Sequence, residues 1–301
     1  MRLLLIDGHY YLYRSYFAIR GLTNSRGEPT NAIYGFLKAM RKMVADLQPG
    51  LGAVVWDHGL PDRRTTLQAA YKQHRPEMPP EMRSQEAWLQ ANVPLAGFAS
   101  LSVPNTEADD LIASYARKAV EDGHKVVIAT NDKDILQLTS EHVAIYSTAK
   151  MDAGTNGFAL LGPEKIKEKW GVEPRQIAEI LALTGDTSDN IPGVPGVGAK
   201  TAAQLVLMYQ TVENLLTQID TVEPEKLRQK LENAKDLIQA NRRMVALDED
   251  LPLPKPVDDL MIAPQYDPLI AALEACEFKS LLKEIRAESE RSRIVEQGQL
   301  F

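Results

Sequence analysis

Cysteine is nearly absent from this chain of 301 residues, which contains only Cys276. A single thiol excludes an internal disulfide and a zinc site built from several cysteines, and it favours a reducing, cytoplasmic setting. No run approaches the roughly 18 apolar residues that a membrane span needs. The run Leu3–Ile6 is too short for the hydrophobic region of a signal peptide. We therefore expect a cytoplasmic protein with no membrane partner.

Histidine is also scarce, and the 34 basic residues are outnumbered by 41 acidic ones. The five histidines are scattered and show no ligand spacing such as HExxH. The formal net charge of −7 by itself argues against a nucleic-acid partner. The segment from Arg63 to Arg75, however, contains four basic residues (Arg63, Arg64, Lys72 and Arg75) and no acid. Local charge decides phosphate binding more than total charge does, so this segment is a candidate contact for nucleic acid, although basic residues on a helix often face only solvent.

The chain is rich in acidic residues, and nine of them form short motifs. Most of these nine follow an apolar run. The nine acids in question are Asp7, Asp57, Glu107, Asp109, Asp110, Asp132, Asp134, Asp186 and Asp189. If the apolar runs are parallel strands, their carboxyl ends meet at one sheet edge and bring the acids together. Two unit charges 4 Å apart repel by about 4 kcal/mol near a protein surface, so such a group needs a cation. Carboxylate oxygens favour Mg²⁺ or Mn²⁺, which predicts phosphoryl chemistry.

Each acid taken alone also has a structural explanation. Glu107, Asp109 and Asp110 fall in the first turn of an expected helix, where the helix dipole favours an acid by about 0.3–1 kcal/mol. Asp132 and Asp134 are compatible with an N-cap and a first-turn acid. The complete set is what favours metal binding, because helix capping does not require further carboxylates at the strand ends.

The segment 185–202 (GDTSDNIPGVPGVGAKTA) is the most specific in the chain. Gly193, Gly196 and Gly198 beside a helix start predict a tight hairpin between two helices. Its backbone N–H groups and the following helix N-terminus would bind phosphate, and Lys200 would add a positive charge. A plain connection between helices does not explain so many glycines and prolines in so short a loop.

The order of expected elements predicts the fold class. Up to about residue 150, helical periodicity alternates with strand-like runs at 2–6, 52–57, 101–104, 125–130 and 143–146. This alternation is typical of an α/β fold with a doubly wound, mostly parallel sheet. After about residue 160 the strand-like runs stop, and helical patterns occupy about 163–170, 174–185, 199–209, 223–246 and 267–286. From residue 287 the sequence is polar, and we expect a flexible tail.

Five segments in this order and spacing carry a family resemblance: LLLIDG (3–8), VVWD (54–57), EADD (107–110), TNDKD (130–134) and the glycine-rich 185–202. Together they closely resemble the bacterial 5′→3′ exonuclease domain of DNA polymerase I, a member of the flap endonuclease family, up to about residue 285. The resemblance implies a PIN-like, metal-dependent catalytic domain at 1–162 with a basic arch at about 61–90. It implies a helical duplex-DNA-binding region of the helix–three-turn–helix type at 163–286, followed by the flexible tail at 287–301.

The resemblance also implies two Mg²⁺ (or Mn²⁺) ions. Asp7, Asp57, Glu107, Asp109, Asp110 and Asp132 resemble ligands of the first ion, and Asp134, Asp186 and Asp189 those of the second. Lys72 and Arg75 resemble the catalytic arch residues that contact the scissile phosphate and the 5′ strand. The hairpin at 193–198 resembles a duplex-backbone binder that often holds K⁺ through its carbonyls. The predicted DNA-binding residues are Arg63, Arg64, Tyr71, Lys72, Arg75, Gly193, Val194, Gly196, Val197, Gly198, Lys200 and Thr201.

Two positions depart from the family pattern. His58 stands in a Trp-Asp-His sequence where the family commonly has Phe-Asp-Ala, and Asn131 stands where it commonly has glycine before the DKD motif. Neither change removes a predicted ligand. The family's polymerase module is absent from this sequence.

The expected function is structure-specific 5′→3′ exonuclease and 5′ flap endonuclease activity on DNA in replication and repair, with RNA primers as a further substrate class. Two alternatives stay open. A PIN-fold ribonuclease would share the acids but would not need the glycine-rich hairpin. A non-catalytic duplex-DNA-binding module would keep the hairpin but not the full set of acids.

The last five residues give a separate prediction about a partner. Gln297, Leu300 and Phe301 match the pentapeptide by which bacterial replication proteins bind the sliding clamp. A short segment with two apolar anchors is typical of groove binding, although five residues also match by chance. Such a tail favours a free-standing exonuclease, and we expect a monomer.

Overall fold

The computed structural model of the protein describes residues 1–148 and 157–298. The chain forms two compact units, each built from separate segments. The first unit comprises Met1–Trp56, Glu77–Ser102 and Pro254–Phe301, and the second comprises Asp57–Pro76 and Val103–Leu253. This division differs from the domain boundary predicted at residue 162, which stays a prediction. Within the described ranges, the helices are all too short or too polar to cross a membrane.

Three parallel strands make up the sheet of the first unit, in the order β3-β2-β1. They are β1 (Arg2–Asp7), β2 (Leu51–Val55) and β3 (Ala99–Leu101). Nearly every side chain of β1 and β2 is buried, as expected for parallel strands covered on both faces. The predictions of strands at 2–6 and 52–57 are confirmed. The third strand lies at 99–101 and not at 101–104, because its pairing with β2 uses Ala99 to Leu101.

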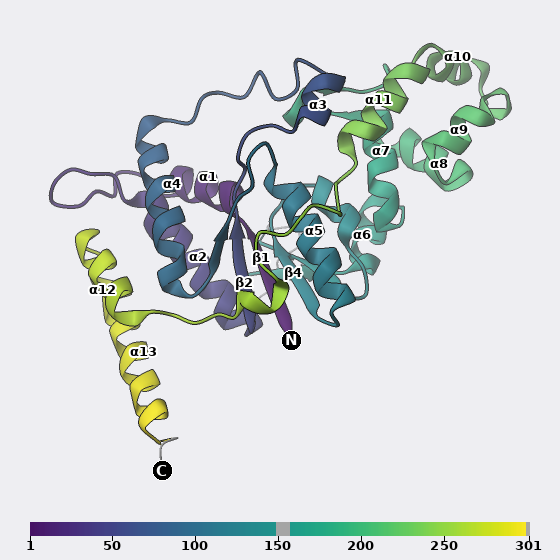
Figure 1. Ribbon diagram of the computed structural model, residues 1–301. Coiled ribbons are helices and arrows are strands. Elements are labelled where there is room, and N and C mark those ends of the chain that lie inside the picture. Colours follow the sequence, from purple (N-terminus) through teal and green to yellow (C-terminus); the bar gives the residue numbers. More distant parts are fainter. Residues whose placement is uncertain (149–156, 299–301) are drawn as a thin grey trace. The chain divides into compact units, whose positions relative to one another are not determined.

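Three helices of the first unit pack against one another (Figure 1): α1 (Gly8–Ala18), α2 (Asn31–Leu47) and α4 (Pro80–Asn92). The apolar face of α2 is buried along its length. Gln85 of α4 accepts hydrogen bonds from the first N–H groups of α2, at 2.7 Å from Ala32 and 3.2 Å from Ile33. This buried side chain therefore caps a helix that its own sequence leaves uncapped. The short 3-10 helix η1 (Val93–Ala96) follows α4.

The C-terminal part of the first unit is a pair of helices, shown in yellow in Figure 1. They are α12 (Tyr266–Ala275) and α13 (Lys279–Gly298), preceded by the 3-10 helix η6 (Val257–Leu260). The single helix predicted at 267–286 is wrong, because the chain turns at Glu277, whose φ is 60°. The helical backbone also continues beyond residue 287, where the sequence suggested a tail. Arg41 of α2 bonds to Glu288 of α13 at 2.6 Å and thereby joins the two helices.

The second unit contains three further strands in the order β4-β5-β6: β4 (Lys125–Ala129), β5 (Val143–Ser147) and β6 (Ala159–Leu161). β4 and β5 are parallel, and β6 is antiparallel to β5. The helix α5 (Ala108–Glu121) packs against β4, and α3 (Asp62–Leu67) belongs to the same unit. The strands at 125–130 and 143–146 were predicted, whereas the short β6 was not.

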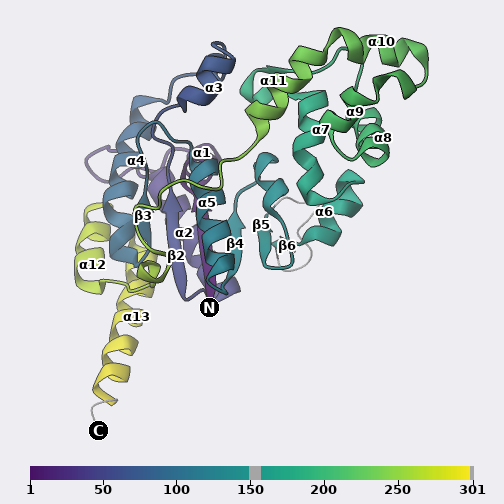
Figure 2. The ribbon, with the colours of Figure 1, turned by 45° about the vertical axis from the view of Figure 1, so that its right-hand side comes forward.

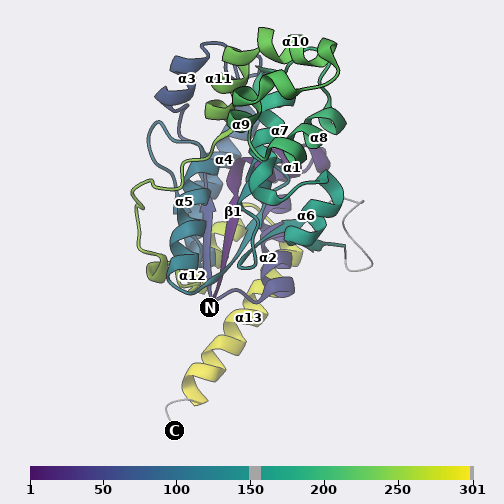
Figure 3. The same ribbon diagram turned by 90° about the vertical axis from the view of Figure 1, so that its right-hand side faces the viewer.

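Most of the rest of the second unit is helical. Its helices are α6 (Pro163–Trp170), α7 (Ile177–Thr184), α8 (Ala199–Tyr209), α9 (Val212–Thr217), α10 (Glu225–Asn233) and α11 (Lys235–Val245). Figures 2 and 3 show α7 to α11 grouped together, with α7 packed against both α8 and α11. The predictions for α6 and α8 are confirmed. The single helix predicted at 223–246 is wrong, since the helix breaks at Ala234 into α10 and α11.

Candidate active site

A short hairpin after α7 positions two of the predicted acids. Strands β7 (Gly185–Asp186) and β8 (Ile191–Pro192) pair antiparallel, and the 3-10 turn η4 (Thr187–Asp189) lies between them. The Asp186 carboxylate accepts a hydrogen bond from the Ser188 N–H at 2.8 Å and so caps this turn. Asn190, with φ of 60°, reverses the chain after Asp189. Both carboxylates are buried, at 3% and 6% exposure.

A second turn, directly after β4, brings a third acid to the hairpin. The Asp132 N–H donates to the Thr130 hydroxyl at 3.0 Å, and the Asp132 carboxylate accepts from the Asp134 N–H at 2.9 Å. These two bonds fix the start of the 3-10 helix η2 (Asp134–Leu138). The Asp134 side chain is thereby held in the buried interior of the unit.

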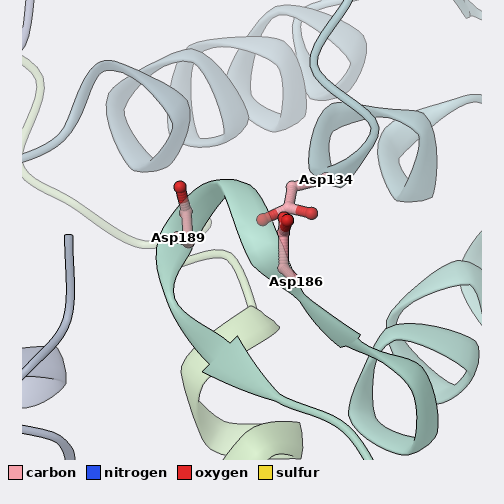
Figure 4. A group of neighbouring side chains, drawn as sticks. All are labelled: Asp134, Asp186 and Asp189. Carbon is pink, nitrogen blue, oxygen red and sulfur yellow. The ribbon is translucent and has the colours of Figure 1, made fainter. Parts of the chain in front are cut away.

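Asp134, Asp186 and Asp189 form a cluster that can hold a cation (Figure 4). One carboxylate oxygen from each lies within 4.8 Å of the other two. Oδ1 of Asp134 is buried and has no hydrogen-bond partner within residues 1–148 and 157–298. Burial, reinforced by the negative charges of Asp132, Asp186 and Asp189, raises the pKa of Asp134 well above its ordinary value. Burial likewise raises the pKa of Asp132.

Lys133 partly offsets this negative charge. Its ammonium lies 2.8 Å from Oδ1 of Asp186. The sequence prediction treated Lys133 only as the spacer of the DKD motif and did not assign it a role. The DKD motif could have indicated this pairing, because a lysine between two clustered acids is well placed to pair with a third.

The segment after α3 returns to the same hairpin. The Lys72 N–H donates to the Asp189 carbonyl at 3.2 Å, and the Asn190 side-chain amide donates to the Ala70 carbonyl at 2.8 Å. Lys72 has φ of 54°, in the left-handed region that L-residues with a side chain seldom adopt. Here the conformation lets both the backbone and the ammonium of Lys72 contact the acids.

Lys72 and Tyr71 join Glu107 to Asp189. The Lys72 ammonium bonds to Glu107 and lies 3.5 Å from Oδ2 of Asp189. The Tyr71 hydroxyl lies 3.0 Å from Oε1 of Glu107 and 3.1 Å from Oδ2 of Asp189. Burial, together with these carboxylates, raises the pKa of Tyr71, so its hydroxyl keeps its proton. Burial alone would lower the pKa of Lys72, but Glu107 and Asp189 outweigh it and raise that pKa.

Arg75 completes the set of cations around Asp189. Its guanidinium bonds to Oδ1 of Asp189, and its side chain is 46% exposed. Arg75 is therefore anchored at the acids and also accessible to a ligand. The structure thus brings both predicted catalytic cations to the predicted acids.

Arg64 lies deeper than the sequence suggested. Its side chain is buried, bonds to Glu107, and contacts both oxygens of Asp110 at 2.9 Å. Arg63 also donates to Oδ1 of Asp110, at 2.7 Å. The side chains of Arg64 and Tyr71 are both 3% exposed and are bonded to acids of the protein itself, and their contact with DNA stays a prediction.

The remaining predicted acids have other local environments. Asp57 accepts a hydrogen bond from the Ala108 N–H at 2.7 Å, and so binds the first turn of α5. Asp109 lies in that same first turn. Asp7 belongs to the first unit, where it is the N-cap of α1 and accepts from the Tyr10 N–H at 2.9 Å. The bonds of Asp7 and Asp57 therefore hold the first turns of α1 and α5.

The glycine-rich loop after β8 has the predicted hairpin form. The Val194 N–H donates to the Leu183 carbonyl at 2.8 Å, and Gly196 has φ of 76°. Val194 and Val197 are buried, so they present only backbone groups to a ligand. Gly198 is the N-cap of α8 and has no side chain to bond the first N–H groups, while Lys200 is exposed in the first turn. A helix N-terminus of this kind favours anions.

Asn241 supports this loop from α11. Its buried amide donates to the Ala182 carbonyl at 3.1 Å and to the Pro192 carbonyl at 2.8 Å. The sequence prediction missed this residue. One sequence feature could have indicated it: Asn241 is a polar residue on the apolar face of a helix, three residues after Ile238 and four before Val245.

The packing of this loop predicts that two glycine substitutions reduce stability by very different amounts. A Cβ at position 193 would lie 2.0 Å from the Thr184 carbonyl oxygen, whereas a Cβ at Gly198 meets nothing within 4 Å. We expect Gly193→Ala to lose stability at the upper end of the roughly 1–3 kcal/mol typical of overpacking, or more. Gly198→Ala is the matched control and should lose about 1 kcal/mol or less. Urea unfolding measures both, and equal midpoints would contradict the packing described here.

Comparisons with known proteins agree with this architecture. Residues 2–171 match the family model for the 5′-3′ exonuclease N-terminal resolvase-like domain, and residues 172–268 match the one for its C-terminal SAM fold. A 5′-3′ exonuclease of Aquifex aeolicus is 38% identical over 295 residues, which cover 96% of this chain and 98% of that protein. A thermostable DNA polymerase I of Thermus thermophilus is 40% identical over 285 residues. That match covers 94% of this chain but 33% of the polymerase, so the chain spans about a third of this relative's length.

Solved structures share the fold. A T5 5′-exonuclease with divalent zinc ions bound has a TM-score of 0.66 at 20% identity, covering 96% of this chain and 98% of that one. The catalytic core of Rad2 in complex with DNA substrate has a TM-score of 0.59 at 17% identity, covering 91% of this chain and 87% of that one. At such low identity these likenesses show the fold alone, which is the predicted PIN-like, mostly parallel α/β class followed by a helical region. From the family models and the relative that it matches over nearly its full length, the chain belongs to the 5′-3′ exonuclease family.

Proposed function

We propose that this protein is a metal-dependent 5′→3′ exonuclease and 5′ flap endonuclease that hydrolyses DNA phosphodiesters in replication and repair. The observation that carries the proposal is the buried cluster of Asp134, Asp186 and Asp189, of which Asp186 and Asp189 lie on the hairpin that leads into the glycine-rich loop. A cluster of acids fits a metal site, and the loop fits a phosphate backbone. Both features lie in the second unit of a chain from an exonuclease family.

The residues present fit divalent metal ions. Oδ1 of Asp134 is a buried acceptor that no protein group satisfies, and the donors around it are hard carboxylate oxygens. We propose two Mg²⁺ or Mn²⁺ ions. Asp134, Asp186 and Asp189 would hold one, and Asp57, Glu107, Asp109 and Asp132 of the same unit are the candidates for the other. Bound there, such ions activate water and stabilise the leaving oxygen of the phosphodiester.

Lys72 and Arg75 are the proposed catalytic cations. Both are anchored by Glu107 or Asp189, so their charge is positioned beside the proposed metal site. Their role would be to stabilise negative charge that develops on the scissile phosphate. The partly exposed Arg63 and Arg75 would also contact the incoming 5′ strand, and cleavage would leave 5′ phosphates.

The loop at 193–198 is the proposed contact for duplex DNA. Its backbone N–H groups and the N-terminus of α8 would bind phosphates, with Lys200 and Thr201 in the first turn and K⁺ held by the loop carbonyls. Contacts of this kind position a duplex without reading its sequence. We further propose a cytoplasmic monomer, in keeping with the single cysteine and the absence of a predicted membrane segment.

A comparison of substrates tests the proposed function. We expect metal-dependent cleavage of a 5′-labelled DNA flap at a rate at least about tenfold above that on single-stranded RNA of equal length, because only the flap offers a duplex for the loop to grip. EDTA should abolish the reaction. Faster cleavage of the RNA would favour the PIN-fold ribonuclease, and binding of the flap without any turnover would favour the non-catalytic module.

The C-terminal peptide gives a second prediction, which concerns a partner. We propose that Gln297, Leu300 and Phe301 bind the sliding clamp; Leu300 and Phe301 lie outside the described residues. Deleting residues 297–301 should abolish retention of the protein on immobilised clamp while leaving flap cleavage unchanged. Undiminished retention would remove the peptide from consideration.

A further inference from the structure

Every nitrogen of the Arg64 guanidinium group donates hydrogen bonds within the second unit. Nη1 donates to Glu107 and to Asp110, and Nη2 donates to Asp110 and to the Ala246 carbonyl at 3.2 Å. Nε donates to the Met244 carbonyl at 3.0 Å. All five N–H groups therefore have acceptors, two of which are backbone carbonyls, one in the last turn of α11 (Met244) and one directly after it (Ala246). Arg64 thus joins a predicted metal ligand, Glu107, to a segment more than 130 residues further along the chain.

Asp110 is occupied by the same partners. Oδ1 accepts from Arg63 at 2.7 Å, from Arg64 at 2.9 Å and from the Asp248 N–H at 2.9 Å. Oδ2 accepts from Arg64 at 2.9 Å. Oδ1 of Asp110 already accepts three hydrogen bonds and has little room for a metal ion, whereas Oδ1 of Asp134 has no partner among the residues that the structure describes.

The segment 244–251 receives further bonds from the same unit. Gln137 donates to the Val245 carbonyl at 3.1 Å and to the Asp134 carbonyl at 2.8 Å. The Ser114 hydroxyl of α5 lies 2.9 Å from the Asp248 carbonyl and accepts from the Leu251 N–H at 3.0 Å. The segment is therefore fixed both to the helix that begins at Glu107 and to the turn that carries Asp134.

The segment 244–251 includes the end of α11 and the residues that follow it, and α11 supports the glycine-rich loop. Asn241 of α11 bonds to the Pro192 carbonyl, directly before Gly193. Arg64 and Asn241 thus act on the two ends of one short stretch, residues 241–246. A continuous set of hydrogen bonds runs from Glu107 through Arg64 and α11 to the loop proposed to bind DNA.

We propose that Arg64 and Asp110 are positioning residues, which clasp the segment 244–248 and thereby fix the DNA-binding loop relative to the catalytic acids, and that Asp110 is not a metal ligand. The inference rests on the proposed function. It assigns Asp110 a different role from the other acids. Because a small misplacement of bound substrate lowers the chemical rate more than it lowers binding, the clasp should act on kcat.

The test uses Asp110→Asn, Arg64→Lys and the double variant in the full-length protein. Lysine keeps the charge of Arg64 but not its planar set of donors. Each single variant should lower kcat on a 5′ flap by about tenfold, with the dissociation constant for duplex DNA and the Mg²⁺ activation midpoint changed by less than about threefold. The double variant should be no worse than about twofold below either single variant, because the two residues act as one unit.

Hydrogen exchange gives a readout that is independent of catalysis. In both single variants, amides in residues 244–251 should exchange about tenfold faster, whereas α7 keeps its protection. The matched control is Arg117→Gln, which removes an exposed ion pair from the same helix α5 to Asp250 in the same segment. Exposed pairs contribute little, so this control should leave both the exchange and kcat unchanged. If Asp110→Asn does not fold, Ser114→Ala weakens the same segment by one hydroxyl and should speed the same amides.

Three results would overturn the proposal. One is a shift of the Mg²⁺ midpoint by about tenfold or more in Asp110→Asn but not in Arg64→Lys, which would make Asp110 a ligand. Another is an amide exchange rate in residues 244–251 that is the same in the single variants as in the wild type. The third is a loss of kcat in the double variant that equals the product of the losses in the two single variants. If the wild-type protein shows no metal-dependent flap cleavage, the proposed function fails, while the exchange data still decide whether the clasp exists.

Discussion

Asp134→Asn should lower metal-dependent cleavage of a 5′ flap by at least about 100-fold, the magnitude typical of removing one preorganised electrostatic contact in an active site. The change keeps the size of the side chain and removes a negative charge from the cluster with Asp186 and Asp189. Turnover of a labelled flap at saturating Mg²⁺ measures the effect. Asp220→Asn, at an exposed site in the 3-10 helix η5 (Ile219–Thr221), is the matched control and should be fully active.

The same substitution should make the metal-free protein more stable. Burial and the neighbouring acids raise the pKa of Asp134 in the folded state above its unfolded value near 3.9. The folded protein then binds a proton more strongly than the unfolded chain, so its stability falls as the pH rises from about 4 up to the raised pKa. Asp134→Asn removes this contribution, and its melting temperature in EDTA at pH 8 should exceed that of the wild type. Full activity, or a lower melting temperature in EDTA, would contradict the assignment of Asp134 to the metal site.

Lys72→Ala should lower the same cleavage rate by about 100- to 1,000-fold. Lys72 bonds to Glu107, lies 3.5 Å from Asp189, and adopts a left-handed backbone that fixes its ammonium at the acids. Alanine removes that charge without providing another donor. Affinity for duplex DNA should change by less than about threefold, because we expect backbone contacts in the loop at 193–198 to supply most of the grip on duplex DNA. A steady-state assay with a separate binding titration distinguishes kcat from affinity.

Folding must be checked for Lys72→Ala, because it removes a partner from the buried Glu107. Breaking such a pair costs about 3–5 kcal/mol in typical cases, so the assay belongs well below the melting temperature that circular dichroism gives for the variant. Lys167→Ala is the control, since Lys167 forms an exposed ion pair with Glu173 in another part of the second unit. A folded Lys72→Ala protein that cleaves within about threefold of the wild-type rate would remove Lys72 from the proposed mechanism.

Local patterns account for most of the elements. The apolar runs ending at Asp7 and at Trp56 form buried parallel strands, and the periodicity of residues 33–47 forms α2. Pro163 and Gly171 begin and end α6 as their conformational preferences dictate. These signals act within a few residues, so the sequence displays them directly. The breaks at Ala234 and Glu277 carry neither glycine nor proline, and they depend on what the flanking helices pack against.

The acids show the same distinction. Their positions after apolar runs and in the glycine-rich segment were sufficient to predict a metal site and the chemistry that goes with it. Which acid would be left without a protein partner was not predictable. Asp134 has an unsatisfied oxygen, whereas Asp110, with the same side chain, is surrounded by Arg63, Arg64 and the Asp248 N–H.

The sequence by itself therefore determined the family, the set of acids and basic residues, and most of the helices and strands, because each depends on residue type and short-range spacing. Only the tertiary structure decided the partner of each charge. Arg64 and Asp110 are 46 residues apart, and the backbone groups that complete their bonding lie a further 130 residues along the chain. Whether a basic residue faces solvent or a buried carboxylate depends on such distant contacts, and no local pattern encodes them.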